Sequence, residues 1–379
     1  MINSTLSILI RSAWVFILAT NIAFAAILPN NIAWVTNTDS SEWSSNHAQK
    51  GGLFRLNISS FPPTLRTVGP DSNNSFRSFL LDNQLPLVDM HPNTGEIIPI
   101  LASHWAYDAD GKTVYYKIKD NARWSDGKPV TADDFLFALE FNRSKDIVAP
   151  WYNKHYSEEI TDVIKFDSRT IAIVGARKKP KKDLHYYYSI QPRAKHFHQL
   201  NSRWVTKFNW KIEPNTGPYQ ITKIRKGKTI EFTRKLAWWA EDNRYLRNRF
   251  NVDKVLIKTV RDPNTAFKYF ERGELDVFNL TIPKLWHKKS NGPMFNKGFI
   301  HKLSFYNQVE QGASGLFLNL ENSILKNIDV RKAIAHSLNF DKIIKQLLRS
   351  DYQRLPTFHT GYGDYSNNEI EPPGFNLKK

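Results

Sequence analysis

Two groups of side chains have the residue types and spacings of a catalytic or metal-binding site. Asp133 and Asp134 are adjacent carboxylates, and a pair of carboxylates serves as general acid and base when both face one substrate. His196 and His198 are separated by one residue, a spacing that places both imidazoles on the same face of a strand. Two imidazoles so placed, with His185 nearby in the sequence, can supply part of a metal site. These residues are therefore the first candidates for a catalytic or metal-binding centre.

Local structure can account for both groups without a catalytic or metal-binding role. Residues adjacent in sequence do not face each other on a helix, so Asp133 and Asp134 are poorly placed to share a substrate. A helix start accounts for both, because Thr131 is a typical N-cap and acidic side chains in the first turn oppose the helix dipole. No acidic residue between Lys195 and Asn209 completes a metal site, so surface histidines are the favoured interpretation. We expect no catalytic residue, no metal and no cofactor.

Composition and charge point to a globular protein with more than one domain. The 379 residues are 41% hydrophobic and 23% charged, and a chain of this length exceeds a single hydrophobic core. Lys and Arg number 53 against 36 Asp and Glu, a net charge of +17, which raises the question of a nucleic-acid or anionic membrane partner. The basic residues are scattered, and a proline interrupts the one dense run, 177–183. We expect no nucleic-acid partner.

The beginning of the chain has the pattern of a secretory signal peptide. Arg11 precedes an apolar run from Ser12 to Phe24, and Ala23-Phe24-Ala25 fits the small-x-small pattern of a signal peptidase site. The apolar run is shorter than the roughly 20 residues that span a bilayer. We expect cleavage between Ala25 and Ala26 and export to the periplasm. The sequence has no cysteine, which excludes disulfides, a cysteine nucleophile and an N-terminal lipid anchor on cysteine.

Alternation of apolar residues and turn signals predict a mixed α/β chain that follows an irregular terminus at 26–50. The predicted strands are 53–58, 101–107, 112–119, 170–174, 251–260, 274–278 and 315–320, and a further hairpin is predicted over 216–235 with its turn at 226–228. In the hairpin around the turn at 108–111, Val114, Tyr116 and Ile118 are expected to face inward and Tyr115 outward.

Helices are predicted where capping residues precede a periodic apolar pattern. The predicted helices are 132–144 after Thr131, 263–272 between Asp262 and Gly273, 329–339 capped by Asp329, and 341–350 capped by Asp341. The helix after Asp262 lies between two predicted strands, an arrangement that indicates a strand–helix–strand crossover unit.

Four blocks of the sequence resemble one protein family. The stretch 115–140, "YYKIKDNARWSDGKPVTADDFLFALE", resembles the signature block of the family 5 extracellular solute-binding proteins, receptors of ABC importers for oligopeptides, dipeptides, nickel and related cargo. The stretches 215–221, 236–278 and 315–343 resemble later blocks of that family in order and spacing. The resemblance covers about residues 51–379, and the opening, 51–74, is similar to the oligopeptide and microcin branch.

The resemblance implies a fold and a division into domains. The fold is α/β, a periplasmic binding protein of type II with two lobes that close like a clam, domains I and III around a cleft and domain II as an added lobe. The signature block at 115–140 is then structural. The implied boundaries are a signal peptide at 1–25, an irregular mature terminus at 26–50, domain I at 51–80 and 217–300, domain II at 81–216, and the start of domain III at 301–379.

The resemblance also implies a function and a set of contacts. Family members bind ligand and deliver it to an ABC transporter permease in the inner membrane, and an oligopeptide would lie extended, held by main-chain hydrogen bonds as an added strand. The chain is then a periplasmic receptor, a monomer and not an enzyme. The implied ligand contacts are Ser59, Ser60, Phe61, Trp151, Tyr152, Asn279, Leu280 and Phe317, each of which could instead serve ordinary packing.

One departure from the family pattern concerns length. Family members are longer, and the resemblance places a further helix, most of domain III, the returning part of domain I and the carboxylate that grips the peptide amino terminus after Lys379. The chain taken alone is therefore expected to bind peptide weakly or not at all, as a truncated form, and to expose a large apolar face.

Two other readings stay open at this point. One is a receptor of the same fold for another ligand, such as a nickel chelate or a sugar. The other is an exported enzyme or adhesin that uses the cationic surface. The enzyme is disfavoured because the sequence assembles no set of nucleophile, base and orienting group.

Overall fold

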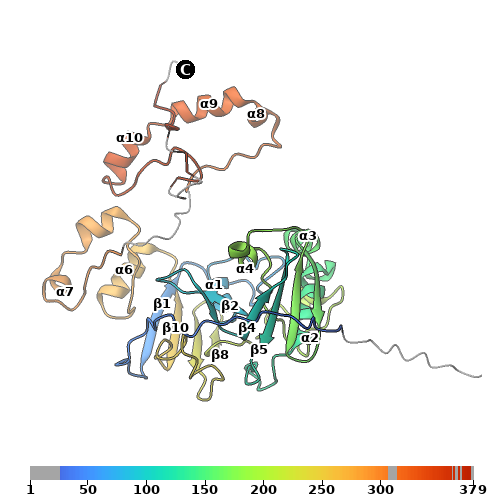
Figure 1. Cartoon of the computed structure of the whole chain (residues 1–379). Helices are drawn as coiled ribbons and strands as arrows, with labels where there is room; N and C mark the ends of the chain where they lie inside the picture. Colours follow the sequence, from blue (N-terminus) through green and yellow to red (C-terminus); the bar gives the residue numbers. More distant parts are fainter. Residues whose placement is uncertain (1–25, 306–313, 361, 363–365, 368, 377–379) are drawn as a thin grey trace, which may run out of the picture. The chain divides into compact units, whose positions relative to one another are not determined.

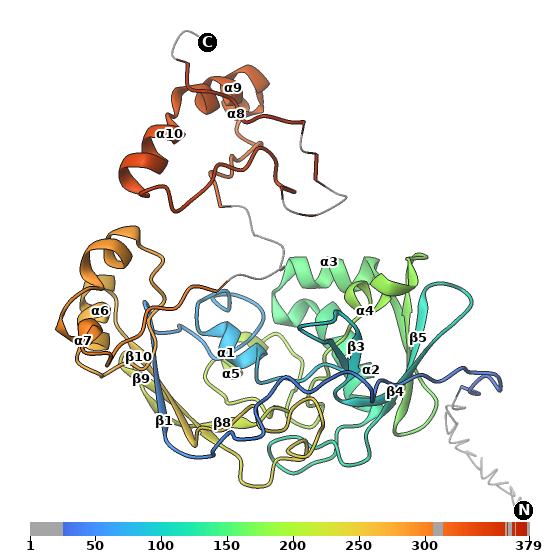
Figure 2. The same cartoon turned by 60° about the vertical axis from the view of Figure 1, so that its left-hand side comes forward.

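The computed structural model of the protein describes residues 26–305, 314–360, 362, 366–367 and 369–376 (Figures 1 and 2). The chain divides into two compact units, the first ending at Arg261 and the second beginning at Asp262, and each is described by itself. The predicted signal peptide at 1–25 lies outside the described residues, and Ala26 is exposed. In the described ranges, no helix is long and apolar enough to cross a membrane. The division into a signal peptide, an irregular terminus and domains I, II and III stays a prediction.

Strands and short helices alternate along the first unit. Its strands are β1 (Leu53–Ile58), β2 (Val88–Met90), β3 (Ile97–Pro99), β4 (Ala102–Tyr107), β5 (Thr113–Ile118), β6 (Ile160–Lys165), β7 (Thr170–Gly175), β8 (Tyr219–Arg225), β9 (Thr229–Arg234) and β10 (Lys254–Thr259). Its helices are α1 (Arg77–Leu81), α2 (Ala132–Arg143), α3 (Pro150–Glu158), α4 (Leu184–Tyr187) and α5 (Trp204–Lys207), with 3₁₀ turns η1 (Lys145–Ile147) and η2 (Lys181–Asp183).

The first sheet has the strand order β1-β10-β9-β8, with β1 parallel to β10 and the other pairs antiparallel. It joins a strand from the start of the unit to three strands from its end, which run side by side in Figure 2. Alternate apolar residues of these strands meet α1 and the segment before it in a core that includes Ile58, Phe76, Ile230, Phe232 and Ile257. The predicted strands of this sheet are confirmed.

The second large sheet is antiparallel, with the order β4-β5-β7-β6, and contacts α2 and α3 through β6. The predicted hairpin of β4 and β5 and the predicted strand β7 are confirmed. The largest apolar cluster of the first unit lies between this sheet and α2 and includes Trp105, Tyr116, Trp124, Phe135 and Ile171. A two-stranded sheet of β2 and β3 leads into β4.

The turn and helix start at 123–135 fold as the sequence predicts. Gly127 has a φ of 85°, a value that glycine adopts without strain, and its N–H donates to the Trp124 carbonyl at 3.0 Å. Thr131 caps α2 in a capping box with Asp134. The stretch therefore has a structural role, as the cap and the helix dipole suggested.

The N-terminal strap, residues 26–50, contains no regular helix or strand in the described chain, yet it crosses the first unit as an ordered segment. Val35 pairs with Trp105 of β4 through two backbone hydrogen bonds of 2.8 and 3.0 Å. Further along, the Tyr245 hydroxyl donates to the Asn37 carbonyl at 3.0 Å. The strap thus contacts both the second sheet and the connection between β9 and β10.

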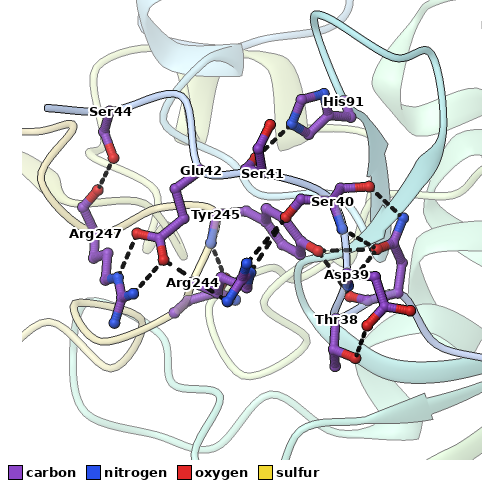
Figure 3. Close-up of polar contacts among 12 residues, drawn as sticks. Thr38, Asp39, Ser40, Ser41, Glu42, Ser44, His91, Arg244, Tyr245 and Arg247 are labelled. Carbon is purple, nitrogen blue, oxygen red and sulfur yellow. Dashed lines mark hydrogen bonds and ion pairs between the residues drawn. The ribbon is translucent and has the colours of Figure 1, made fainter.

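Polar contacts fasten the end of the strap, as Figure 3 shows. The Glu42 carboxylate forms an ion pair with Arg247, and a second guanidinium, that of Arg244, lies 3.8 Å away. His91 Nε2 lies 2.7 Å from the Ser41 carbonyl oxygen. These contacts join the strap to two loops that are distant from it in sequence.

The strap also explains a burial that the hairpin pattern does not predict. Tyr115 faces outward as predicted, away from Val114, Tyr116 and Ile118, but it is buried against Ala106 and Ala172 rather than exposed. Leu28, Ile32 and Trp34 of the strap pack against this outer face of the sheet. The sheet is therefore covered on both faces, which period-2 alternation on its own does not reveal.

The second unit is built of short helices. They are α6 (Pro263–Glu271), α7 (Pro293–Asn296), α8 (Ser323–Lys326), α9 (Ile328–Ser337) and α10 (Phe340–Lys342), with π-helical turns η3 (Leu285–Lys289) and η4 (Ile343–Leu347). Asp262 caps α6 as predicted, its side chain accepting from Thr265 N at 2.7 Å. Asn327 and Asn339, rather than Asp329 and Asp341, cap the helices that follow.

Two predicted strands of the second unit are wrong. Residues 274–278 and 315–320 form no strand, so the crossover unit around α6 is not present either. Leu316, Phe317 and Leu320 of the second stretch stay exposed, with Phe317 at 79% of its full accessible area. A strand needs a partner for its backbone groups, and neither stretch belongs to a sheet in the part of the chain that the structure describes.

Candidate ligand-binding surface

Three of the predicted ligand contacts lie at one end of the first sheet. Ile58 is opposite Thr259 in the parallel pair of β1 and β10, so Ser59, Ser60 and Phe61 leave the sheet where β10 also ends. Ser59 and Ser60 are exposed and Phe61 is half-buried. Extended backbone that leaves a sheet with small exposed side chains is accessible to a ligand strand.

An aromatic contact holds Phe61 in place. Its ring stacks on Trp210, with centroids 5.8 Å apart and planes 16° from parallel. The segment before Trp210 is tied to the chain that follows Phe61, because the Asn209 carbonyl accepts hydrogen bonds from Leu65 N and Thr64 Oγ1, both at 2.9 Å. Sequence reasoning missed Trp210, since it had no local signal to separate this tryptophan from the ten others.

Two further predicted contacts lie next to each other at the start of α3. Trp151 is 66% exposed and stacks on His155, with ring centroids 5.0 Å apart. Tyr152 is half-buried, and its hydroxyl accepts a hydrogen bond from Arg77, whose Nε donates to the Thr67 carbonyl at 2.6 Å. Trp151 thus presents a free aromatic face, whereas Tyr152 is anchored to the segment that leads into α1.

A buried ionic cluster lies beneath this part of the unit. The Glu213 carboxylate accepts two hydrogen bonds of 3.0 Å from Arg193 Nη1, and His198 Nε2 lies 2.9 Å from Glu213 Oε1. Burial alone would raise the pKa of the Glu213 carboxyl, but the charges of Arg193 and His198 lower it to about 2. Arg193 and Glu213 also line a small cavity with Thr67 and Asn83. The Glu213 carboxylate is therefore ionised at neutral pH and is held by Arg193.

The expectation of surface histidines is wrong for two of the three. His198 is buried against Glu213. His185 is also buried, with Nε2 and Nδ1 at 2.7 and 2.8 Å from the hydroxyls of Tyr107 and Tyr116. Burial lowers the pKa of His185 to about 4.

His196 and His198 do not act together. They lie in a turn rather than on a strand, and His196 Nε2 contacts Asp126 Oδ2 at 2.6 Å while His198 contacts Glu213. Within the described ranges, no group of three histidine or acidic side chains could hold a metal ion. Glu213, the acidic partner of His198, follows Asn209 in the sequence and so lies outside the stretch 195–209, which contains no acidic residue.

The remaining predicted contacts belong to the second unit. Asn279 and Leu280 line a cavity of about 1160 Å³ together with Phe278, Phe295 and Trp286. Phe317 does not line this cavity, and its ring is 6.5 Å from that of Phe358. The structure thus brings Asn279 and Leu280 onto one wall and leaves Phe317 elsewhere, and the role of all eight predicted contacts stays a prediction.

Comparison with known proteins identifies the family. Residues 96–379 match the sequence model of the family described as bacterial extracellular solute-binding proteins, family 5 middle. A binding protein of Brucella suis is 27% identical over 264 residues, which cover 69% of this chain and 42% of that protein. A YejA protein of Agrobacterium fabrum, named as peptide-binding, is 22% identical and is matched over 85% of this chain and 53% of its own length. The chain spans about half the length of these curated relatives.

Solved structures show the same fold. The oligopeptide-binding protein AppA of Bacillus subtilis, solved with a nonapeptide, has a TM-score of 0.67 at 20% identity, over 87% of this chain and 63% of that one. NikZ of Campylobacter jejuni, solved with a nickel–histidine complex, has a TM-score of 0.64 at 18% identity, over 86% and 61%. The predicted α/β fold of a type II periplasmic binding protein is confirmed. The chain belongs to the family 5 bacterial extracellular solute-binding proteins.

Proposed function

We propose that the chain is a receptor that captures extended oligopeptides, or peptide-like cargo, outside the cytoplasm and delivers them to the permease of an ABC importer. The observation that carries this proposal is the family match over residues 96–379, because the family consists of solute-binding proteins. A binding role also means that the chain is not an enzyme. Export through a signal peptide at 1–25, cleavage after Ala25, a periplasmic location and a monomeric state complete the proposal.

The peptide class is supported by the relatives and by the surface of the first unit. The Agrobacterium relative is named as peptide-binding, and AppA was solved with a nonapeptide. At the sheet end, Ser59 and Ser60 expose backbone and small hydroxyl side chains beside the ring of Phe61. An extended peptide can be held there through its main chain, because main-chain hydrogen bonds do not depend on the side chains of the cargo.

Aromatic side chains complete the proposed contact surface. Trp151 offers a ring that is 66% exposed and already oriented by its stacking on His155. A rigid aromatic ring gives a large contact area at a small cost in side-chain entropy, which suits a receptor for varied cargo. Asn279, Leu280 and Phe317 of the second unit are proposed as further contacts on the resemblance alone.

The proposal is tested by titration of the purified chain with three probes: a pool of tripeptides to pentapeptides, the nickel–histidine complex and mannohexaose. Binding is followed by isothermal titration calorimetry and by tryptophan fluorescence. We expect a saturable response to the peptide pool only. A saturable response to nickel–histidine or to the sugar without one to peptides, or no saturable response to any probe, would contradict the proposal.

Single substitutions link the response to the surface. Phe61→Ala and Trp151→Ala are expected to weaken peptide binding. Trp239→Ala is the comparison variant, because Trp239 is not one of the proposed peptide contacts. If neither Phe61→Ala nor Trp151→Ala changed the dissociation constant, the proposed location of the site would be wrong while the peptide class could stand.

A further inference from the structure

The stretch that ends in the first sheet is strongly basic. Residues 193–235 contain eleven Lys and Arg and only two acidic residues, Glu213 and Glu231. Both carboxylates are already engaged, Glu213 with Arg193 and His198, and Glu231 with Lys254 at 3.3 Å. Most of the positive charge in this stretch is therefore not neutralised by its own acidic side chains.

Strand register places part of this charge next to the predicted peptide contacts. The tight turn between β8 and β9, residues 226–228, follows Arg225, which is opposite Thr229. Thr229 is in turn opposite Lys258 near the end of β10, and Thr259 N donates to the Lys228 carbonyl at 2.8 Å. Ile58 of β1 ends at the same level as Thr259. The turn and the exit of β1 thus lie at the same end of one sheet.

Side-chain contacts confirm this placement. Lys226 Nζ lies 4.8 Å from the ring centroid of Trp210, the ring on which Phe61 stacks. Lys211, the next residue, reaches over the ring of Phe208 at 4.9 Å. Cations held over aromatic rings at an exposed site keep their charge facing solvent or a ligand.

These cations have no carboxylate partner in the described residues. We call the group the cationic sheet end; its members are Phe61, Trp210, Lys211, Arg225, Lys226 and Lys228. Its four cations are exposed, and each of the ion pairs found in the described ranges involves other side chains. Asp262 lies shortly after β10 in the sequence, and its carboxylate caps the N-terminus of α6.

We propose that the cationic sheet end selects cargo by charge, so that the preferred ligand of this receptor is an acidic peptide whose carboxylates face Arg225, Lys226 and Lys228. This inference rests on the proposed function and adds the chemical class of the cargo. Several like charges around a ligand attract the opposite charge and exclude the same charge, and this effect governs selectivity more than total affinity. A carboxylate of a side chain and that of a peptide C-terminus share this chemistry.

The experiment compares two peptides of equal length and terminal charge, Ala-Glu-Glu-Ala and Ala-Gln-Gln-Ala, on the full chain at low ionic strength. We expect the acidic peptide to bind about tenfold more tightly, since several exposed pairs each contribute modestly. The preference is expected to fall in about 0.15 M salt, where the screening length shrinks to about 8 Å. Because both peptides carry the same C-terminus, the comparison isolates side-chain carboxylates.

Two charge-matched variants decide whether the sheet end is responsible. Arg225→Gln/Lys226→Gln/Lys228→Gln is expected to reduce the preference to about twofold or less, whereas Lys178→Gln/Lys181→Gln/Lys182→Gln, with the same loss of charge, retains it. Lys226→Glu alone should lower the affinity for the acidic peptide more than that for the neutral peptide. Circular dichroism confirms that each variant is folded.

The outcomes separate the two proposals. Equal affinity for the acidic and the neutral peptide, or a preference that survives loss of the three sheet-end cations, overturns the charge selection and leaves the peptide receptor in place. A preference lost equally in both triple variants shows a general effect of net charge and also overturns it. If neither peptide bound, the proposed function and this inference would both be contradicted.

Discussion

The Glu213 carboxylate and the Arg193 guanidinium form a largely buried ion pair, with Arg193 Nη1 at 3.0 Å from both carboxylate oxygens. The side chains of Arg193 and Glu213 are only 14% and 19% exposed. The Arg193 guanidinium also lies 4.8 Å from the ring centroid of Phe141 on α2. The pair therefore joins the segments at 193–198 and 213 to the core beneath α2, close to the chain that leads to the proposed peptide contacts.

Glu213→Gln is expected to lower the free energy of unfolding by about 3–5 kcal/mol, because it leaves the buried Arg193 charge without its counter-ion. Urea unfolding followed by tryptophan fluorescence measures this change. Glu159→Gln is the matched control, since Glu159 pairs with Arg177, whose side chain is 64% exposed, and an exposed pair contributes about 1 kcal/mol or less. Equal effects of the two substitutions would show that the pair is not buried in solution.

The same carboxyl predicts an acid-dependent loss of stability. Its folded pKa of about 2 lies below the ordinary value of 4.5, so the unfolded chain binds more protons between these values. The stability from this group is complete above about pH 4.5 and is lost as the pH falls toward 2. The difference in unfolding free energy between the wild type and Glu213→Gln should shrink over this range. A difference independent of pH from 6 to about 2.5 would contradict the assignment.

Asp133 and Asp134 should respond very differently to alanine. Asp134 is buried, and its side chain accepts hydrogen bonds from Thr131 N at 2.9 Å, Trp124 Nε1 at 3.2 Å and Lys195 N at 3.1 Å. Its loss is expected to cost about 3 kcal/mol, because it leaves buried donors unsatisfied. Asp133 makes one partly exposed ion pair with Lys165, so Asp133→Ala should cost less than about 1 kcal/mol. Thermal unfolding of both variants tests the contrast.

Local sequence patterns predicted the parts of the fold that depend on neighbours in the chain. The β4–β5 hairpin follows from alternation and from the turn at Asp110-Gly111, and the start of α2 follows from Thr131 and the acidic residues after it. The failures depend on distant segments. Tyr115 is buried because the N-terminal strap covers it, and alternation within β5 carries no information about the strap.

The candidate site shows the same division. The resemblance pointed to Phe61 and Tyr152, but their environments come from tertiary contacts that no local pattern encodes, such as the stacking of Phe61 on Trp210 and the hydrogen bond from Arg77 to Tyr152. The apolar run at 315–320 has the composition of a strand, yet composition does not supply the partner that a strand requires.

Trp43 is expected to fasten the N-terminal strap. Its ring stacks on Tyr245 at 6.0 Å and meets His91 edge-on at 4.7 Å, and the Arg249 guanidinium lies 4.8 Å from its centroid. Trp43→Ala should lower the free energy of unfolding by about 2–3 kcal/mol, and amide exchange in the strap should become faster. The exposed Trp151 serves as control, since Trp151→Ala should change stability by less than about 0.5 kcal/mol. Unchanged amide exchange in Trp43→Ala would show that this ring does not hold the strap.

Lys235 predicts a second pH effect, on the alkaline side. Its ammonium donates to Asn215 Oδ1 at 2.8 Å and to the Gly217 carbonyl at 2.5 Å, and burial lowers the pKa of Lys235 to about 7. The ordinary pKa of a lysine is 10.5. Between pH 7 and 10.5 the unfolded chain therefore binds more protons at Lys235 than the folded protein does. The contribution of Lys235 to the free energy of unfolding thus rises with pH across that window. In Lys235→Met this rise should be absent. Between pH 7 and about 10, the free energy of unfolding of the wild type should increase relative to that of the variant by on the order of 3 kcal/mol. Lys228→Met, at an exposed turn, leaves the pH dependence unchanged. If Lys235→Met retained the full alkaline rise in unfolding free energy, the burial of this amine would not be what governs it.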